Sequence, residues 1–521
     1  MRLINFNLKK GKNYLLLAFM ILAFSPCESL LAQAELSLSL SEVVSLAKNE
    51  APDELKDRIT QSILARDAQI ARTQLTNNYW QYQQFLSNYK PQINLNATLP
   101  SFNRSIDGVP QPDGSIRFLS FNNMQNRISA SLTQSIAKTG GRVAVSTGLR
   151  RFDIFGANGG VSYFSSPIEI SFNQPFFAFN ELKWDKIIEP MRYKEAKRQF
   201  AENLEATAQD AVRLFFNIYI AQISLDAAQK DKQNADTLYI ISQGRYNVGR
   251  IAETELLQIE ISKLNADGAL AAATLDLQSS TENLRNFLGI KEAVTFKLTP
   301  PTEIPEFYID AQKALSHAKE NRSKVIELER RLKEAERNLE AAKKNNGFNL
   351  SVSGGFGLAQ TDESFAGAYT NLLDNENISV NVTVPIMDWG RAEARREIAM
   401  SNQELVGMSV EQERINFERD ILIKVQQFDL VRNQTSLALK NYEVSQKTYD
   451  LTRKRYLIGK IGVIDLNLAL ADQERSRRAY MSALRSFWLA YYEIRRLTLY
   501  DFINNQPLIS NLGNQLEEEN R

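Results

Sequence analysis

The sequence predicts an α+β membrane protein in which two tandem structural repeats combine barrel strands with very long helices. Three observations predict this class. An offset of 210 residues superposes the two halves of the chain without a gap. Stretches of up to about sixty residues hold almost no proline and are dominated by strong helix formers. The segments between them alternate apolar and small polar residues with a period of two, which is typical of a barrel wall between lipid and water.

The composition excludes most chemistry. The chain has 521 residues, a formal net charge of +1, one cysteine and one histidine. A single histidine and a single cysteine cannot supply an ordinary metal site or a histidine-based acid–base pair. A balanced charge gives no general attraction to nucleic acid. We therefore expect a protein that is not an enzyme, with no catalytic residues, no cofactor, no metal and no nucleic-acid partner.

The N-terminus reads as a signal peptide over residues 1–34. Basic residues precede a short apolar run from Leu15 to Phe24, and Ala32-Gln33-Ala34 is a small-x-small cleavage site. Cys27 is either a lipid-attachment residue or is discarded with the signal, and Pro26 before it favours the second. No later window is apolar enough for a transmembrane helix, so a secreted chain of this kind can cross a membrane only as a closed barrel.

Two landmarks define the internal repeat. Gln174-Pro175-Phe176-Phe177 falls on Val384-Pro385-Ile386-Met387 when the chain is shifted by 210 residues. Arg245-Tyr246-Asn247-Val248-Gly249 falls on Arg455-Tyr456-Leu457-Ile458-Gly459 with the same shift. Because no gap is needed between these landmarks, we expect equal helix lengths in the two copies.

The landmarks and breaks fix the expected elements in order. The copies span residues 35–299 and 309–500, with a proline-rich linker at 300–308 and a polar C-terminal tail at 501–521. Repeat 1 is expected to hold a helix over about 42–89, strands over about 91–177, a long helix over 181–243, a tip at 244–251 and a helix over 252–288. Repeat 2 is expected to hold a helix over 310–345, strands over about 348–388, a long helix over 391–453, a tip at 454–462 and a helix over 463–498. A helix of sixty residues is ~90 Å long, which implies a coiled or stacked tube.

The strand region is longer in the first copy than in the second. Gly140-Gly141 invites a turn inside it, so one chain supplies either four or six strands. An additional hairpin could enlarge the barrel or fold as an insertion, and the sequence leaves both open. In either case one chain has too few strands for a barrel with a water-filled lumen, which requires several copies.

These landmarks resemble the TolC-type outer-membrane efflux proteins over nearly all of the chain after the signal. The segment from Pro385 to Arg391, with Trp389 and Gly390, resembles that family's strand-to-helix junction, and Pro175 and Phe176 occupy the matching place in the first copy. The aromatic residues there suit a membrane–water girdle or, alternatively, an ordinary aromatic core. The two hairpin tips resemble those of the family at Arg245, Tyr246, Gly249, Arg455, Tyr456 and Gly459.

The resemblance implies a homotrimer in the outer membrane of a Gram-negative bacterium. Strands of all three copies would form one β-barrel in contact with outer-membrane lipid, and the helices would continue it as a coiled-coil tunnel with a large periplasmic portion. The tips would close like an iris and dock a periplasmic adaptor (membrane-fusion) protein linked to an inner-membrane pump. Asp465 matches the acidic residue that lines the family's constriction, the periplasmic gate. The next acidic position of the family is Leu468 here.

Alternatives remain for function and for the individual residues. The same architecture serves as a type I protein-secretion conduit. A secreted coiled-coil scaffold without a channel is the alternative from a different class, and it predicts long helices without paired strand segments. Asp465 could be an ordinary acidic residue of a first helical turn. Tyr246 and Tyr456 could pack across the hairpins without contacting a partner.

Overall fold

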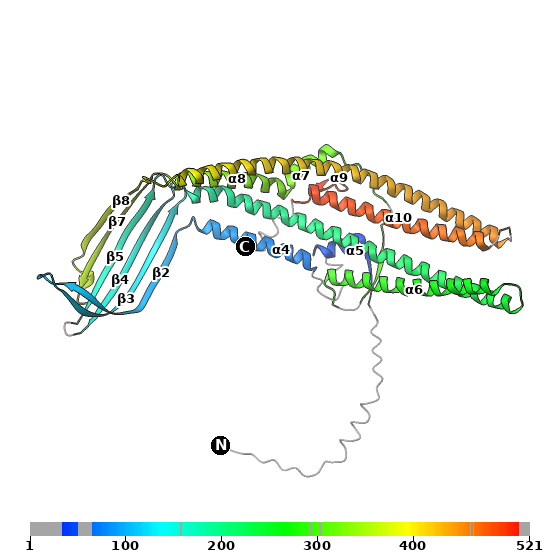
Figure 1. Cartoon of the computed structure of the whole chain (residues 1–521), viewed down its shortest axis with the longest axis horizontal. Coiled ribbons are helices and arrows are strands. Elements are labelled where there is room, and N and C mark those ends of the chain that lie inside the picture. The colour runs from blue at the N-terminus through cyan, green and yellow to red at the C-terminus, as the bar shows by residue number, and fades with distance from the viewer. Residues whose placement is uncertain are drawn as a thin grey trace, which may run out of the picture.

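The protein, a computed structural model, is described over residues 34–50, 65–156, 159–291, 294–301, 304–458, 460–461 and 463–509. One β-sheet forms one end of an elongated molecule, and helices run from it to two hairpin tips at the other end (Figure 1). Residues 1–33, which include Cys27 and most of the expected signal peptide, lie outside the described residues, as do 510–521 of the expected tail.

The sheet has six antiparallel strands in the order β2-β3-β4-β5-β7-β8. The first copy supplies four strands and the second copy two, so the additional hairpin belongs to the wall of the sheet. The strands are β2 (Gln92–Pro110), β3 (Ile116–Ile136), β4 (Gly141–Phe155), β5 (Gly160–Pro175), β7 (Asn349–Asp362) and β8 (Leu373–Thr383). A short 3-10 helix, η1 (Gly367–Tyr369), lies in the loop between β7 and β8.

The two faces of the sheet differ in chemistry. Ile93, Leu132, Val145 and Ile170 are successive cross-strand partners and form one apolar row. The adjacent row consists of Asn94, Ser131, Ser146 and Glu169, which are also successive partners. We call these the apolar face and the polar face. The alternation expected from the sequence therefore continues across four strands, because neighbouring strands keep their apolar residues on the same side.

The long helices have equal lengths in the two copies. The helices α5 (Glu181–Asn247) and α9 (Arg391–Leu457) each have 67 residues. The helices α6 (Glu253–Leu288) and α10 (Val463–Thr498) each have 36 residues. The helices α5 and α6 form one helical hairpin and α9 and α10 form the other, and both hairpins point away from the sheet (Figure 1). The equal lengths agree with the ungapped repeat.

The expected helices at the start of each copy are interrupted. In copy one, α2 (Leu40–Ala47) ends early, Asn49 adopts a left-handed φ of 59°, and α4 (Arg66–Ser87) begins after residues 51–64, which are not described. In copy two, α7 (Ala311–Asn321) and α8 (Ser323–Asn345) are separated by an extended Arg322. The single helices expected over 42–89 and 310–345 are therefore wrong.

Contacts distant in the sequence explain both breaks. The Asn49 side chain bonds both backbone groups of Ala65, accepting from N–H at 3.0 Å and donating to the carbonyl at 3.3 Å. The Ser323 N–H donates to the Glu202 carboxylate at 2.7 Å, and the Arg322 guanidinium pairs with the same carboxylate at 3.1 Å. Glu202 on α5 thus satisfies an orphan donor at the start of α8.

The middle of the molecule holds the main apolar core. Here β1 (Ala34–Ser39) pairs in parallel with β6 (Val294–Thr299). Large fully buried side chains such as Phe215, Phe428 and Phe487 bring α5, α9 and α10 together in this core. The chain after α10 forms a small hairpin of β9 (Tyr500–Asp501) and β10 (Gln506–Pro507). The polar tail expected from residue 501 therefore begins with ordered structure.

A buried ionic network ties the two copies together beside this core. Glu205 of α5 is 2% exposed and accepts from Lys48 and from Arg495 of α10, the latter through Nε at 3.0 Å and Nη2 at 3.2 Å. Arg495 also donates to Asp501 at 2.8 Å, and the Tyr491 hydroxyl donates to Asp501 at 2.6 Å. The network therefore joins copy one, copy two and the C-terminal hairpin.

Candidate functional site

The first tip turns on a glycine. Gly249 has a φ of 68°, and no atom lies within 4 Å of the position that a Cβ would occupy. The glycine is therefore required for its backbone conformation and not for space. The Arg250 N–H donates to the Arg245 carbonyl at 2.8 Å, the six-to-one bond that ends many helices at a left-handed residue. Arg245 and Tyr246 lie in the last turn of α5 and not in the loop.

The second tip closes with the same bond. The Lys460 N–H donates to the Arg455 carbonyl at 3.0 Å, 210 residues after its counterpart in the first tip. Arg455 and Tyr456 belong to the last turn of α9. Gly459 lies outside the described residues. Both expected tips, at 244–251 and 454–462, thus begin with a helical turn, because α5 and α9 extend four residues further than expected.

An exposed carboxylate marks the same position beyond each tip. Asp465 lies in the first turn of α10, and its side chain is exposed. Glu255, 210 residues earlier, lies exposed in the first turn of α6. Leu468, one turn after Asp465, is 62% exposed. The sequence predicts Asp465 as a gate residue, and the repeat offset makes Glu255 its equivalent in the first copy.

Each tip also exposes an apolar side chain that the sequence analysis did not select. Val248 is 69% exposed and Ile458 is 66% exposed, and they are equivalent in the repeat. Tyr246, two residues before Val248, is 39% exposed. An apolar side chain on the same exposed turn of both hairpins is a candidate contact for another protein. The sequence could have indicated this pair, because the offset of 210 residues places Val248 on Ile458.

The first strand-to-helix junction is bonded to the backbone of the β3–β4 turn. Pro175 is the last residue of β5, and the Phe176 N–H donates to the Leu350 carbonyl at 2.9 Å. Asn180 caps α5 by accepting from the Lys183 N–H at 3.1 Å, and its side-chain amide donates to the Ala137 carbonyl at 2.9 Å. The turn between the two additional strands is therefore fastened to the start of the long helix.

The second junction presents a large exposed surface. Trp389 is 90% exposed with a left-handed φ of 57°, and Ile386 is 94% exposed. Asp388 caps α9, since its carboxylate accepts from the Gly390 N–H at 3.1 Å and from the Ala392 N–H at 2.8 Å. The exposed side chains agree with a membrane–water girdle and disagree with an aromatic core of the single chain at this junction.

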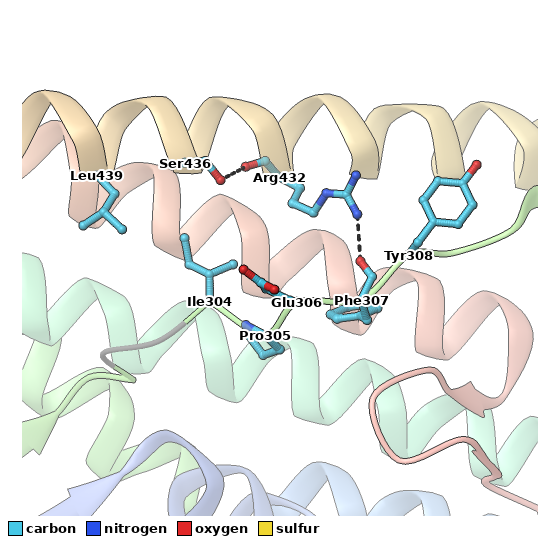
Figure 2. A pocket seen from close by; sticks show the side chains of 8 residues that line it. All are labelled: Ile304, Pro305, Glu306, Phe307, Tyr308, Arg432, Ser436 and Leu439. Atoms are coloured by element: carbon cyan, nitrogen blue, oxygen red, sulfur yellow. Dashed lines mark hydrogen bonds between the residues drawn. The ribbon is translucent and has the colours of Figure 1, made fainter.

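Beside the core, the inter-repeat linker forms a groove of about 1080 Å³ against α9 (Figure 2). The Arg432 guanidinium donates to the Phe307 carbonyl at 2.7 Å and lies 5.9 Å from the centre of the Tyr308 ring. The Phe307 ring packs against Phe428 and Tyr491 of the core. The linker expected at 300–308 is thus attached to the second copy through the carbonyl of Phe307 and through its ring.

Comparisons with known proteins agree with this geometry. The sequence matches the family described as "Outer membrane efflux protein" over residues 61–290 and 314–498. A search of curated proteins finds no match. Within the residues that the structure describes, no helix has both the length and the apolar character needed to cross a membrane.

Solved channels have a similar fold. The Campylobacter jejuni CmeC outer membrane channel is 15% identical with a TM-score of 0.62, over 92% of this chain and 89% of that one. VceC, an outer membrane protein of Vibrio cholerae, is 12% identical with a TM-score of 0.57, over 88% of this chain and 96% of that one. The MtrE outer membrane channel of Neisseria gonorrhoeae, in its open state, is 15% identical with a TM-score of 0.54, over 88% of both chains.

Proposed function

This chain belongs to the outer membrane efflux protein family, and on that premise we propose that three copies form the passive exit duct of a tripartite export system. The chain is an efflux channel subunit of the outer membrane with a large periplasmic portion. One observation carries the proposal: a sheet with a polar and an apolar face continues directly into two helical hairpins of equal length. Such a subunit can provide one wall of a continuous passage through membrane and periplasm.

The sheet supports assembly through its two edge strands. In β2, Ile93 and Leu95 are 79% and 73% exposed, and in β8, Ile378 and Val380 are 65% and 58% exposed. Unpaired edges cannot stand in a bilayer, which demands that every backbone group be bonded. Because the strand number is even, β8 of one copy meets β2 of the next in the antiparallel sense. Three copies of six strands give an eighteen-stranded barrel, a size that encloses an aqueous lumen.

The tips are proposed as the gate and as the docking surface. Asp465 and Glu255 from three copies would place six carboxylates near the narrow end, where they would attract cations and pair with bases in the closed state. The adaptor protein, linked to the inner-membrane pump, would dock on the turns at Arg245, Tyr246, Gly249, Arg455, Tyr456 and Gly459. We add Val248 and Ile458 to that docking surface, because exposed apolar side chains at matching turns suit a protein contact.

The alternatives differ in how well they account for the sheet. A coiled-coil scaffold without a channel has no use for six paired strands with two exposed apolar edges, so we reject it in favour of the duct. A type I protein-secretion conduit would have the same architecture, and the pump that the adaptor recruits would decide between small molecules and polypeptides as cargo.

Single-channel recording in a planar bilayer tests the proposal. The wild-type protein is expected to give small, cation-selective currents, and Asp465→Ala is expected to give larger or less cation-selective ones, because a charge is removed from the constriction. Asp472→Ala is the matched control, since Asp472 lies two turns further along α10 and is 51% exposed. Unchanged currents in Asp465→Ala would keep the channel and discard this gate residue. Absence of conductance from folded, membrane-inserted protein would favour the scaffold.

A further inference from the structure

Three arginines project from the polar face of the β3–β4 hairpin. Arg127 belongs to β3, and Arg142 and Arg150 belong to β4. Every second residue of a strand lies on the same face. Arg127 therefore shares its face with Ser129 and Ser131, and Arg150 shares its face with Gly148 and Ser146, so these guanidinium groups lie on the side that carries the polar row. We call them the arginine belt. All three come from the two strands that the first copy has in addition to those of the second.

Two members of the belt are direct neighbours, and neither forms an ion pair among the described residues. Arg127 and Arg150 are cross-strand partners, an arrangement of like charges that destabilises a sheet. Among the described residues, no carboxylate oxygen lies within 4.0 Å of either guanidinium. Arg150 lies 5.7 Å from the centre of the Phe164 ring, and its buried Nε has no hydrogen-bond acceptor within the described part of the chain. By contrast, Arg151 on the opposite face donates to Asp153 at 2.8 Å.

A hollow of about 200 Å³ lies beside this pair. It is lined by Arg127, Arg150, Ser129, Ser146, Gly148, Phe164, Ser166 and Glu169, with backbone of the same strands. A Cβ at Gly148 would lie in ordinary contact with the Ser129 Cβ, at 3.5 Å. Two guanidinium groups with serine hydroxyls as further donors match the oxygen atoms of a carboxylate, sulfonate or phosphate group. The volume admits such a group with a few waters, each of which takes about 30 Å³.

We propose that the arginine belt is an anion-binding site in the wall of the channel, which holds the oxyanion group of a solute inside the barrel. This inference rests on the proposed function, because the polar face lines a water-filled lumen only in an assembled barrel. A lipid headgroup is a poor candidate ligand, since the side chains that suit lipid contact occupy the other face. Arg142 extends the belt into a second hollow of about 280 Å³, which it shares with Glu169 and Asn377.

Thiol labelling of the full-length protein in liposomes measures the local charge directly. Ser129→Cys places a thiol in the hollow, and the wild-type chain, whose only cysteine is Cys27, gives the background. An anionic and a cationic methanethiosulfonate are applied, and the ratio of their rates is recorded. The anionic reagent is expected to react faster. Adding Arg127→Gln and Arg150→Gln is expected to lower the ratio roughly tenfold, because two positive charges near the thiol are removed in a screened aqueous lumen.

Two controls separate the possible failures. Arg151→Gln removes one charge from the same strand but from the apolar face, and it is expected to leave the ratio unchanged. Ala130→Cys places the thiol on the apolar face, where lipid should protect it from both reagents. Labelling of Ala130→Cys by both would mean that the barrel has not assembled, which contradicts the proposed function. The other contradicting outcome has two parts: Ala130→Cys is protected, and the ratio of rates at Ser129→Cys is the same with and without Arg127→Gln and Arg150→Gln. That outcome would contradict the anion-binding site and leave the proposed channel unaffected.

Discussion

At the scale of the residue, Glu205 of α5 links the two copies of the repeat through Lys48 and Arg495. Its carboxylate is buried in the middle of a 67-residue helix and bonds two cations from different parts of the chain. Burial alone would raise the pKa of Glu205, but the charges of Lys48 and Arg495 outweigh it and hold that pKa below its ordinary value. Asp501 at the other end of Arg495 also has a lowered pKa, because its bonds from Tyr491 and the charge of Arg495 outweigh burial.

We expect Glu205→Gln to destabilise the protein strongly. The variant keeps the shape of the side chain but leaves the buried Lys48 without its counter-charge and Arg495 with Asp501 alone, and breaking a buried pair in this way costs about 3–5 kcal/mol. The midpoint of thermal unfolding of the purified protein in detergent is the measurement. Asp210→Asn is the control, because Asp210 pairs with Arg213 on the surface of the same helix, where such pairs contribute about 0–1 kcal/mol.

The same pair of proteins gives a pH dependence with a definite sign. The pKa of Glu205 is lower in the folded state than in the unfolded chain, so its contribution to stability is complete above the ordinary value of 4.5 and is lost as the pH falls below that value. The difference in unfolding midpoint between wild type and Glu205→Gln should therefore shrink on acidification. A constant difference between pH 7 and pH 3 would show that Glu205 acts through its shape and not through its charge.

Several residues could be placed from the sequence, and others could not. The first-turn position of Asp465 follows from its distance to the tip motif, and the need for Gly249 follows from the turn. The buried network could not be predicted, because Lys48, Glu205 and Arg495 are far apart in the chain, and Glu205 and Arg495 lie in long helices with many other charged residues. A glutamate inside a long polar helix gives no local sign of burial.

At the scale of the element, α9 carries a long apolar stripe that no part of its own chain covers within the described residues. Ile423, Leu430, Leu437, Val444 and Leu451 recur every seven residues, and their exposed fractions lie between 40% and 66%. A seven-residue repeat of this kind forms the seam of a coiled coil. On α6, Leu257, Ile261, Leu264 and Leu275 are exposed to a similar degree. In the proposed trimer, α9 of one copy would pack against a helix of the next.

Charged residues in this stripe are expected to weaken the trimer. Leu437→Lys combined with Val444→Lys would remove apolar contacts worth about 1.5–3 kcal/mol per side chain and place charges in the seam. Light scattering of the detergent-solubilised protein would then report a larger fraction of monomer on dilution. Leu437→Met with Val444→Ile is the matched control and should remain trimeric. A Lys variant as trimeric as this control would place the stripe against something other than a second copy.

The boundaries of the elements show what a sequence pattern can and cannot determine. The starts of α6 and α10 and the end of α6 agree closely with expectation, because a tip motif precedes each helix and Gly289 follows α6. The break at Arg322 has no glycine or proline to mark it and depends on Glu202 of another helix. A break that is made by a distant partner is invisible to helix propensity, and this explains the wrong helix over 310–345. The break after Asn49 had a local signal in the sequence, because Pro52 disfavours a continuous helix over 42–89.

At the scale of the whole molecule, the six-stranded sheet departs from the internal symmetry of the chain. The helices of the two copies match in length, whereas the first copy has four strands and the second has two. The additional strands are not loosely attached, since Ala137 and Thr139 in their turn bond Asn180 and Gln174 at the junction. The family resemblance established the architecture from sequence, but the strand number needed the pairing itself, because a turn at Gly140 is compatible with an insertion.

Electron cryomicroscopy of the protein in nanodiscs should resolve eighteen strands around a threefold axis, six from each copy, since all six are paired in one sheet. The width of the barrel follows from that number. A Ser165→Ala variant, which loses the bond to Ala368 of the outer loop without changing a strand, serves as a control for rim structure. Twelve wall strands, with β3 and β4 folded to one side, would contradict the expectation.

The buried network has a mechanical consequence. It ties α5 to α10 near Glu205, and the contact between the two helices continues towards the tips as far as the Arg477–Asp226 pair at 3.8 Å. Beyond Asp226, α5 extends about 30 Å to its end at the helical rise per residue. A rotation of about 5° at that point would displace the end of α5 by roughly 3 Å. In the proposed trimer, a small rearrangement of packing at mid-molecule would therefore be amplified at the tips, the proposed gate, while the sheet at the other end need not move.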